Sequence, residues 1–351
     1  MTGKPAKKVT QKKTAAKKSA TATKKKTAAK SNSGITASDA LAQAARLFEE
    51  LMKSGDPLIQ QDIGALLTSL QSPSAIDTLS DSEADARIQA QELAFDAMEA
   101  PSEAEPRKLA KRALRLDPDC VDAQLLLAQI DAPSPRVLIE RVQAAVAAGE
   151  RSLGDQFIRE NTGHFWGLLD TRPYMRALEV LAGELAREGI LLEAIALYEK
   201  MLMLNPNDNQ GVRDPLLGLY LQAGNPASAG ALLKRYAGDS SANFAWGRVL
   251  ERYLSGDLDG AVLALKVAQL TNSFVTLYLT GQRPIAHIDP EMYSPGSEEE
   301  AVLCMQWAGL AWSTKKEAIF WLLDQCHAQP PSRIPSKAAL KKTPVRGSRV
   351  Q

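Results

Sequence analysis

The feature that most constrains the fold is an internal repeat of small residues. Three glycines recur at steps of 35 and 32 residues: Gly189, Gly224 and Gly256. An alanine follows each glycine five residues later: Ala194, Ala229 and Ala261. Glycine readily adopts the left-handed conformation that ends a helix, and a small residue lets the next helix pack closely against the first. The spacing therefore predicts a series of two-helix units.

The best-defined unit covers residues 178–208, LEVLAGELAREGILLEAIALYEKMLMLNPND. A first helical pattern ends at Gly189, and a second one continues until Pro206 stops it. Residues 86–129 show the same alternation of apolar helical faces and turn signals. We expect about five such units between residues 85 and 275, which is more than the roughly three that a solenoid needs.

Several positions within these units carry a resemblance to a known repeat family. They are Ala194, Tyr198 and Pro206 in one unit, Leu216, Leu217 and Tyr220 in the next, and Ala261 and Ala268 in the third. Their spacing resembles that of tetratricopeptide repeats. Arg248 and Arg252 stand where that pattern has apolar residues, so the third unit departs from it. The resemblance implies an all-α, tetratricopeptide-like helical-repeat solenoid that binds a protein partner along a concave groove.

Composition agrees with helices and limits the chemistry. Hydrophobic residues make up 45% of the chain and aromatic residues only 5%, with Ala and Leu abundant. The three cysteines, Cys120, Cys304 and Cys326, lie far apart, so neither a disulfide framework nor a zinc cluster is predicted. No stretch approaches the roughly 18 apolar residues of a membrane span. We expect a cytoplasmic protein with no cofactor, no metal site and no membrane contact.

Charge is unevenly distributed along the chain. Residues 1–30 carry eleven lysines and no acidic residue, and residues 333–351 carry six basic residues and no acidic one. The intervening residues 34–332 hold 25 basic and 41 acidic residues, a net charge of −16. The basic tails contain too few apolar residues to offset the entropy of ordering, so we expect both tails to be disordered.

The N-terminal tail resembles the Lys/Ala-rich tails of histone H1-like proteins in composition. A tail of this kind binds nucleic acid through its phosphates, without reading sequence and with strong dependence on salt. The lysines expected to bind a polyanion are Lys7, Lys8, Lys12, Lys13, Lys17, Lys18, Lys24, Lys25 and Lys26. Two other interpretations stay open: a tail that only aids solubility, and one that folds back onto the acidic body.

The chain divides into five predicted segments. They are a disordered Lys/Ala-rich tail (1–34), an N-terminal helical pair (35–72), the tetratricopeptide-like repeats (85–275), a C-terminal capping region (276–328) and a basic disordered tail (329–351). The helical pair is either a cap or a separate docking module. Ser297 and Glu300 have the spacing of a capping box for the last helix, which we expect to cover the open end of the solenoid.

Residues 159–177, RENTGHFWGLLDTRPYMRA, gather a histidine, a tryptophan, a tyrosine and three arginines. The proline in TRP predicts a helix that starts just after Thr171. Three short motifs resemble the suppressor of tumorigenicity 7 family and its bacterial tetratricopeptide relatives. They are HFWG at 164–167, TRPYMR at 171–176 and LNPNDNQGVR at 204–213. This resemblance implies a repeat fold and no defined chemistry.

Polar residues near the starts of two successive first helices predict a partner-binding site. They are Arg172, Arg176, Asn209 and Arg213, with His164 and Tyr174 beside them. Arginines that converge on a groove would bind a protein or an acidic peptide. The alternative is a structural network in which Glu160, Asp170 and the arginines fix the junction.

His164 does not point to catalysis. It has no serine or cysteine nucleophile, phosphate-binding loop or second ligand histidine at a useful spacing. We therefore expect no catalytic residue and no enzyme activity.

Overall fold

The computed structural model describes residues 80–102, 104–288 and 293–328, and these residues form helices, turns and loops with no β-strand among them. The predicted all-α class is confirmed. The two predicted basic tails and the predicted helical pair at 35–72 lie outside the described residues.

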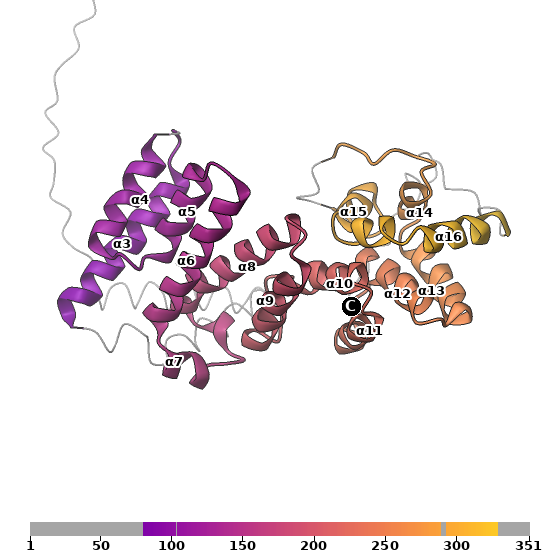
Figure 1. The fold of residues 1–351 in the computed structure, drawn as a ribbon, viewed down its shortest axis with the longest axis horizontal. Helices are drawn as coiled ribbons and strands as arrows, with labels where there is room; N and C mark the ends of the chain where they lie inside the picture. Colours follow the sequence, from indigo (N-terminus) through magenta and orange to yellow (C-terminus); the bar gives the residue numbers. More distant parts are fainter. Residues whose placement is uncertain (1–79, 103, 289–292, 329–351) are drawn as a thin grey trace, which may run out of the picture. The chain divides into compact units, whose positions relative to one another are not determined.

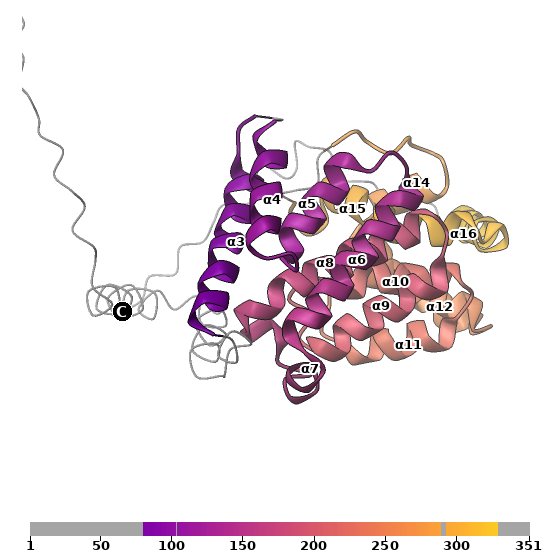
Figure 2. The ribbon, with the colours of Figure 1, turned by 60° about the vertical axis from the view of Figure 1, so that its left-hand side comes forward.

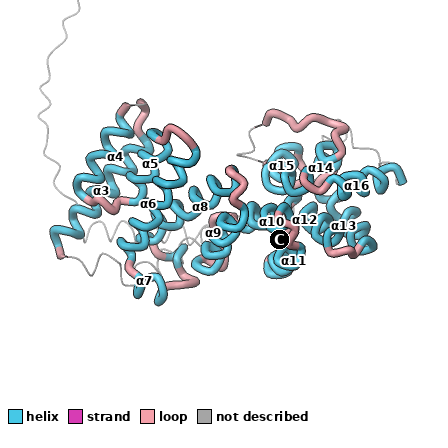
Figure 3. The backbone as a smooth tube through the Cα atoms, in the orientation of Figure 1, coloured by secondary structure: helices cyan, strands magenta, loops and turns pink. Residues whose placement is uncertain are grey.

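Five successive helix pairs make up most of the described chain (Figures 1 and 3). They are α3 (Asp81–Glu99) with α4 (Glu105–Leu116), α5 (Val121–Asp131) with α6 (Pro135–Leu153), α8 (Arg172–Arg187) with α9 (Leu191–Leu204), α10 (Arg213–Gln222) with α11 (Pro226–Arg235), and α12 (Ala242–Leu254) with α13 (Leu258–Thr271). The first helix of each pair is called a first helix below. Figure 2 shows the first two pairs side by side in chain order.

Shorter elements interrupt and follow the pairs. They are α7 (Asp155–Glu160), η2 (Phe165–Gly167), η3 (Leu169–Thr171), α14 (Phe274–Leu279), α15 (Glu298–Ser313) and α16 (Lys316–Ala328). The first three connect α6 to α8, where the sequence shows the dense cluster at 159–177.

The three repeated glycines end α8, α10 and α12 in the same way. Gly189 has a φ of 76°, its N–H bonds the carbonyl of Ala186, and the N–H of Ile190 bonds the carbonyl of Leu185. Equivalent pairs of hydrogen bonds form at Gly224 and Gly256. This pattern closes a helix through a left-handed residue, which glycine adopts without a side-chain clash. The predicted role of the glycines is confirmed.

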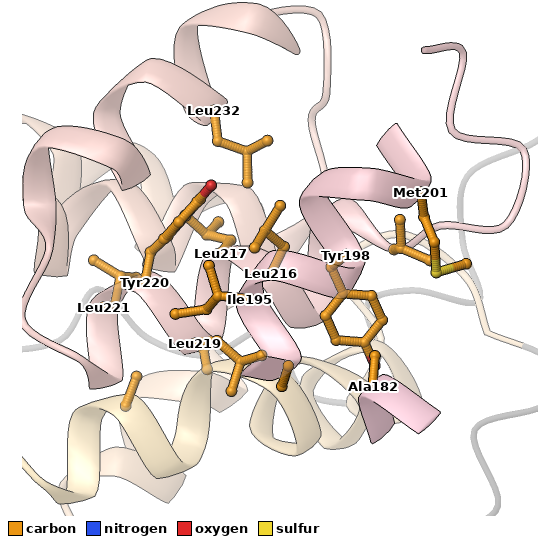
Figure 4. Close-up of a cluster of buried hydrophobic side chains, with 14 of the residues drawn as sticks. Ala182, Ile195, Tyr198, Met201, Leu216, Leu217, Leu219, Tyr220, Leu221 and Leu232 are labelled. Carbon is orange, nitrogen blue, oxygen red and sulfur yellow. The ribbon is translucent and has the colours of Figure 1, made fainter. Parts of the chain in front are cut away.

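The repeated alanines are fully buried between the two helices of their pairs. Figure 4 shows part of the apolar core, with Tyr198 of α9 pointing toward Ala182 of α8, and Leu232 of α11 above the apolar side chains of α10. Buried side chains from α5 to α16 form one continuous apolar cluster. A second, smaller cluster joins α3 and α4 to the start of α5 and consists of Ala90, Ala94, Ala110, Ala113, Cys120 and Ala123.

Helix α15 packs against α10 and α12, the first helices of the fourth and fifth pairs (Figure 1). A Cβ atom on Gly218 of α10 would lie 2.3 Å from the backbone oxygen of Trp307 of α15. Trp312 packs edge-on against Trp246 of α12, with ring centroids 6.2 Å apart. Helix α15 thus packs across the first helices α10 and α12. It can approach α10 closely because Gly218 has no side chain.

The predicted capping box at the start of α15 forms only in half. The Ser297 side chain accepts a hydrogen bond from the Glu300 backbone N–H, at 3.2 Å. The Glu300 carboxylate is buried and accepts instead from the backbone N–H of Gly296 and Ala242 and from the Asn272 amide. It therefore ties the start of α15 to the start of α12.

Candidate functional site

A buried carboxylate joins the first helices of the first three pairs. Asp122 of α5 accepts a hydrogen bond from Gln91 of α3 at 2.7 Å and two from the Arg176 guanidinium of α8 at 2.9 and 2.5 Å. The Asp122 side chain is completely buried, whereas that of Arg176 is 39% exposed. A buried carboxylate needs such partners, because without them it loses its hydration uncompensated. The three helices are therefore held in register at this level.

Beside this junction lies a cavity of about 500 Å³ over the start of α5. The residues that line it come from α3, from the segment between α4 and α5 with the start of α5, from the end of α6, and from η3 with the start of α8. The apolar side chains that line it are Ile88, Phe95, Val121, Leu153, Leu169, Pro173 and Tyr174. We call this space the first-helix cavity.

Three large apolar side chains around the first-helix cavity are open to solvent. Ile88 is 46% exposed, Phe95 48% and Leu169 56%. Single exposed apolar residues are common on protein surfaces, but several that gather around one cavity are typical of a binding site. The cavity is therefore the strongest candidate for a functional site among the described residues.

The arginines at the cavity have partners within the protein. Arg87 donates to the backbone oxygen of Ser152 at 3.2 Å. Arg172 donates twice to the backbone oxygen of Trp166, at 2.9 and 2.6 Å, and its guanidinium carbon lies 3.7 Å from the centroid of the same indole. The acidic residues that also line the cavity are Glu92, Asp117, Asp119 and Asp170. The lining thus carries both signs of charge.

Tyr174 forms part of the cavity wall, and a hydrogen bond of its hydroxyl group fixes its position. Its hydroxyl donates to Glu150 at 3.0 Å, and Lys200 donates to the same carboxylate at 2.9 Å. Burial raises the pKa of Tyr174 to about 12. A Cβ atom on Gly149 would lie only 2.7 Å from the ring, so glycine is required beside it. Tyr174 is thus a neutral, fixed wall residue at physiological pH.

Cys120 also lines the cavity, but it is a structural thiol. Its sulfur donates to the backbone oxygen of Ala90 at 3.7 Å, and burial raises its pKa to about 11. It is therefore a protonated and weakly reactive group.

The structure does not bring Arg213 and Asn209 to this cavity. Arg213 bonds Asp239 at 2.9 Å and Asp208 at 3.2 Å. Asp208 has a φ of 54°, and its carboxylate accepts from the backbone N–H of Val212 and Arg213, which caps α10. Asn209 belongs to the same turn. These contacts join Arg213 to acidic residues other than the Glu160 and Asp170 of the predicted structural network.

The segment before α8 is fixed by backbone contacts. Thr171 is buried, and its hydroxyl donates to the backbone oxygens of Phe165 and Leu168, so it does not cap the helix with its side chain. The helix begins at Arg172 with proline in its first turn, as predicted. His164 lies exposed just before η2 and does not line the cavity.

In the part of the chain that the structure describes, no group of three or more His, Cys, Asp or Glu side chains is placed to hold a metal ion. None of the helices described is long and apolar enough to cross a membrane. The lysines expected to bind a polyanion lie in a part of the chain that the structure does not describe.

The apolar residues of the cavity were missed by sequence reasoning. Ile88 and Phe95 lie on α3, on the opposite side of the helix from the buried Ala90 and Ala94, and neither was predicted as a site residue. A signal was present, since α3 carries large apolar residues away from its alanine stripe. Arg172, Tyr174 and Arg176 are the three predicted site residues that do line the cavity.

No protein-family model and no curated protein match the chain. A tetratricopeptide repeat protein from Parabacteroides merdae is similar in structure, with 14% identity, a TM-score of 0.38, and 70% of this chain and 87% of that one covered. The Pseudomonas aeruginosa protein pilF has 19% identity and a TM-score of 0.28, with 54% and 93% covered.

Both TM-scores are low, and the helix pairs of the chain itself define its fold. The resemblance to the suppressor of tumorigenicity 7 family stays a prediction from its three short motifs. The five capped pairs, with their buried alanines and their continuous core, make this chain an all-α helical-repeat protein.

Proposed function

We propose that the protein is a non-enzymatic scaffold that binds a protein partner at the first-helix cavity. The observation that carries the proposal is the group of exposed apolar side chains, Ile88, Phe95 and Leu169, around a cavity of about 500 Å³. Helical repeats commonly bind partners on the face that their first helices form. The cavity lies on that face, between α3 and α8.

The cavity favours an apolar anchor of the partner over an acidic peptide. Arg87, Arg172 and Arg176 all donate to acceptors within the protein, and acidic side chains lie beside them. A carboxylate from a partner would have to compete with these contacts. An apolar side chain only has to displace water from apolar surface, which is favourable by roughly 25 cal/mol for each Å² buried.

The test is an affinity capture with the full chain as bait. Three forms are compared: the wild type, Phe95→Glu and Leu263→Glu. Phe95 and Leu263 are exposed apolar residues, 48% and 64% exposed, but Leu263 lies on α13, away from the cavity. Proteins captured by the wild type and Leu263→Glu, and lost with Phe95→Glu, would support the proposal. If all three baits capture the same proteins equally, the cavity is not the binding site.

Substitution of the arginines is a weaker test of the same site. Arg176→Ala would leave the buried Asp122 carboxylate without its main partner. Loss of binding in that variant would then report a damaged fold as readily as a damaged site. Substitutions at exposed apolar positions avoid this ambiguity.

A second proposed function is non-specific association with nucleic acid through the N-terminal tail. It is supported by the eleven lysines, unopposed by any acidic residue, in residues 1–30. We expect deletion of residues 1–34 to abolish retention on DNA or RNA, and added salt to weaken retention of the full chain. Retention that survives the deletion would argue against the tail as the binding element.

A further inference from the structure

We infer that the partner segment held at the first-helix cavity is an amphipathic α-helix. The inference rests on the proposed function of this cavity and adds the conformation and the chemistry of its occupant. Four observations carry it: the hydrogen bonds of the polar side chains, the spacing of the apolar side chains, the path that leads from the cavity along α8, and the position of α15.

Several polar side chains at the cavity are already hydrogen-bonded within the protein. Gln91 and Arg176 bond Asp122, and Arg172 bonds the backbone oxygen of Trp166. An extended peptide brings a row of backbone N–H and C=O groups that need partners when they leave water. A helix satisfies its own backbone and presents only side chains. The cavity therefore suits a helix better than an extended segment.

The apolar side chains at the cavity have a spacing that a helix can match. Ile88 and Phe95 are seven residues apart on α3, which is about 10 Å along the helix axis. Leu169 and Pro173, from η3 and the start of α8, line the same cavity. A partner helix with apolar residues at i, i+3 or i+4, and i+7 would place one side chain in the cavity and neighbours on these edges.

A path for such a helix continues from the cavity along α8. Arg176, Val180, Gly183 and Arg187 succeed each other at steps of three or four residues, so they share one face of the helix, and all four are accessible to solvent. A Cβ atom on Gly183 would have its nearest neighbours at 3.8 and 3.9 Å, the Tyr198 hydroxyl and the Arg187 guanidinium. There is thus room above Gly183.

The corresponding glycine of the next pair, Gly218 of α10, already contacts a helix. Gly183 and Gly218 each lie six residues before the glycine that ends their helix, so they hold the same position in the repeat. At Gly218 the backbone of α15 approaches to contact, and small side chains of α15 face the pairs. The first-helix face thus holds a helix over α10 and α12, and Gly183 offers the same approach on α8.

The predicted partner helix is therefore defined by its chemistry. It carries one large apolar side chain for the cavity, small residues such as alanine where it crosses Gly183, and polar residues on its outer face. Its charges need not be of one sign, because the cavity lining carries both signs.

The test selects binders from two displayed libraries of peptides about 18 residues long, roughly five helical turns. One library has a helix-forming background with variable residues on one face. The other library is identical except for two central prolines, which prevent a helix. The baits are the full chain as wild type, Phe95→Glu, Gly183→Leu and the control Leu263→Glu.

The expected result is binders from the helix-forming library alone. Their affinity should fall about tenfold or more with Phe95→Glu and with Gly183→Leu, and stay unchanged with Leu263→Glu. A central proline placed in a selected peptide should abolish its binding. Gly183→Ala, which adds a methyl group where there is space, should weaken binding less than Gly183→Leu.

Two other outcomes separate the inference from the proposed function. Binders from the proline library that depend on Phe95 but not on Gly183 would overturn the helix and leave the cavity as the site. No Phe95-dependent binder from either library would overturn both. Circular dichroism and thermal unfolding of each bait confirm that the variants are folded. If Gly183→Leu does not fold, the comparison of the two libraries on wild type and Phe95→Glu still tests the inference.

Discussion

The carboxylate of Asp122 belongs to α5 and is bonded from both neighbouring first helices, by Gln91 of α3 and Arg176 of α8. Although few in number, buried carboxylates with hydrogen-bond partners are important for stability. The buried Glu300 carboxylate is likewise satisfied by groups distant in the sequence, Ala242 and Asn272. Loss of one partner leaves a charge with neither water nor a counter-charge.

Arg176→Ala is expected to lower the free energy of unfolding by about 2–4 kcal/mol. The reason is the fully buried Asp122 carboxylate that the substitution leaves behind. Guanidinium unfolding of the two proteins measures the difference. The double variant Arg176→Ala/Asp122→Asn should recover part of the loss, and a single variant within about 0.5 kcal/mol of wild type would contradict the buried pair.

Asp214 is expected to make stability depend on pH. Burial raises its pKa to about 6, above its ordinary value of 3.8, although Asn243 donates a hydrogen bond to it at 2.7 Å. The folded state therefore binds this proton more tightly than the unfolded state, and the contribution to stability is lost as pH rises from about 4 through 6. Asp214→Asn should remove this slope and be the more stable protein at pH 7, by about 1–3 kcal/mol.

The measurement is urea unfolding of wild type and Asp214→Asn at several values of pH between 4 and 7.5. The difference between the two curves isolates Asp214 from the other titrating groups. Parallel curves across this range would show that the Asp214 carboxyl titrates normally.

At the scale of elements, the helices and their ends follow from local patterns, whereas the contacts between distant elements do not. The capping glycines and buried alanines were predictable, because helix ends and close packing depend on residues a few positions apart. Arg176 and Asp122 are 54 residues apart, and Gly218 meets the backbone of α15 some 90 residues later. No local pattern marks such pairs, so the roles of the arginines and the position of α15 needed the structure.

Gly218→Ala is expected to destabilise the protein by about 2 kcal/mol or more, because the added methyl group would lie 2.3 Å from the Trp307 carbonyl and push α15 away. Gly183→Ala is the matched control, at the same repeat position but with space above it. It should be neutral or slightly stabilising, by up to about 1 kcal/mol, because alanine favours a helix. Chemical unfolding and tryptophan fluorescence, which reports Trp246 and Trp312, measure both effects. Equal effects of the two substitutions would contradict the close contact at Gly218.

At the scale of the whole described region, stability should be uneven. The first pair, α3 and α4, packs through a small cluster of alanines and Cys120, whereas α10, α12 and α15 share the large cluster with buried leucines, phenylalanine and tryptophans. Burial of less apolar area gives less stabilisation. In repeat proteins, moreover, each unit is supported only by its neighbours.

Hydrogen exchange is expected to show this gradient. Amides of α3 and α4 should exchange through openings that cost at least about 2 kcal/mol less than those that expose α10, α12 and α15. Exchange followed by mass spectrometry at increasing denaturant measures the opening energies. A single opening energy for all these helices would mean that the described pairs unfold as one unit. The result bears on function, because the first-helix cavity lies between α3 and α8.

The contact between Gly218 and Trp307 has a consequence for how related chains can diverge. The atom of residue 307 that touches α10 is its carbonyl oxygen, which every amino acid possesses, while the Trp307 side chain is 36% exposed. Selection for the fold therefore acts on the two positions unequally. The contact itself makes no demand on the side chain at 307, but descendants of this sequence keep the helix in place only while position 218 has no side chain.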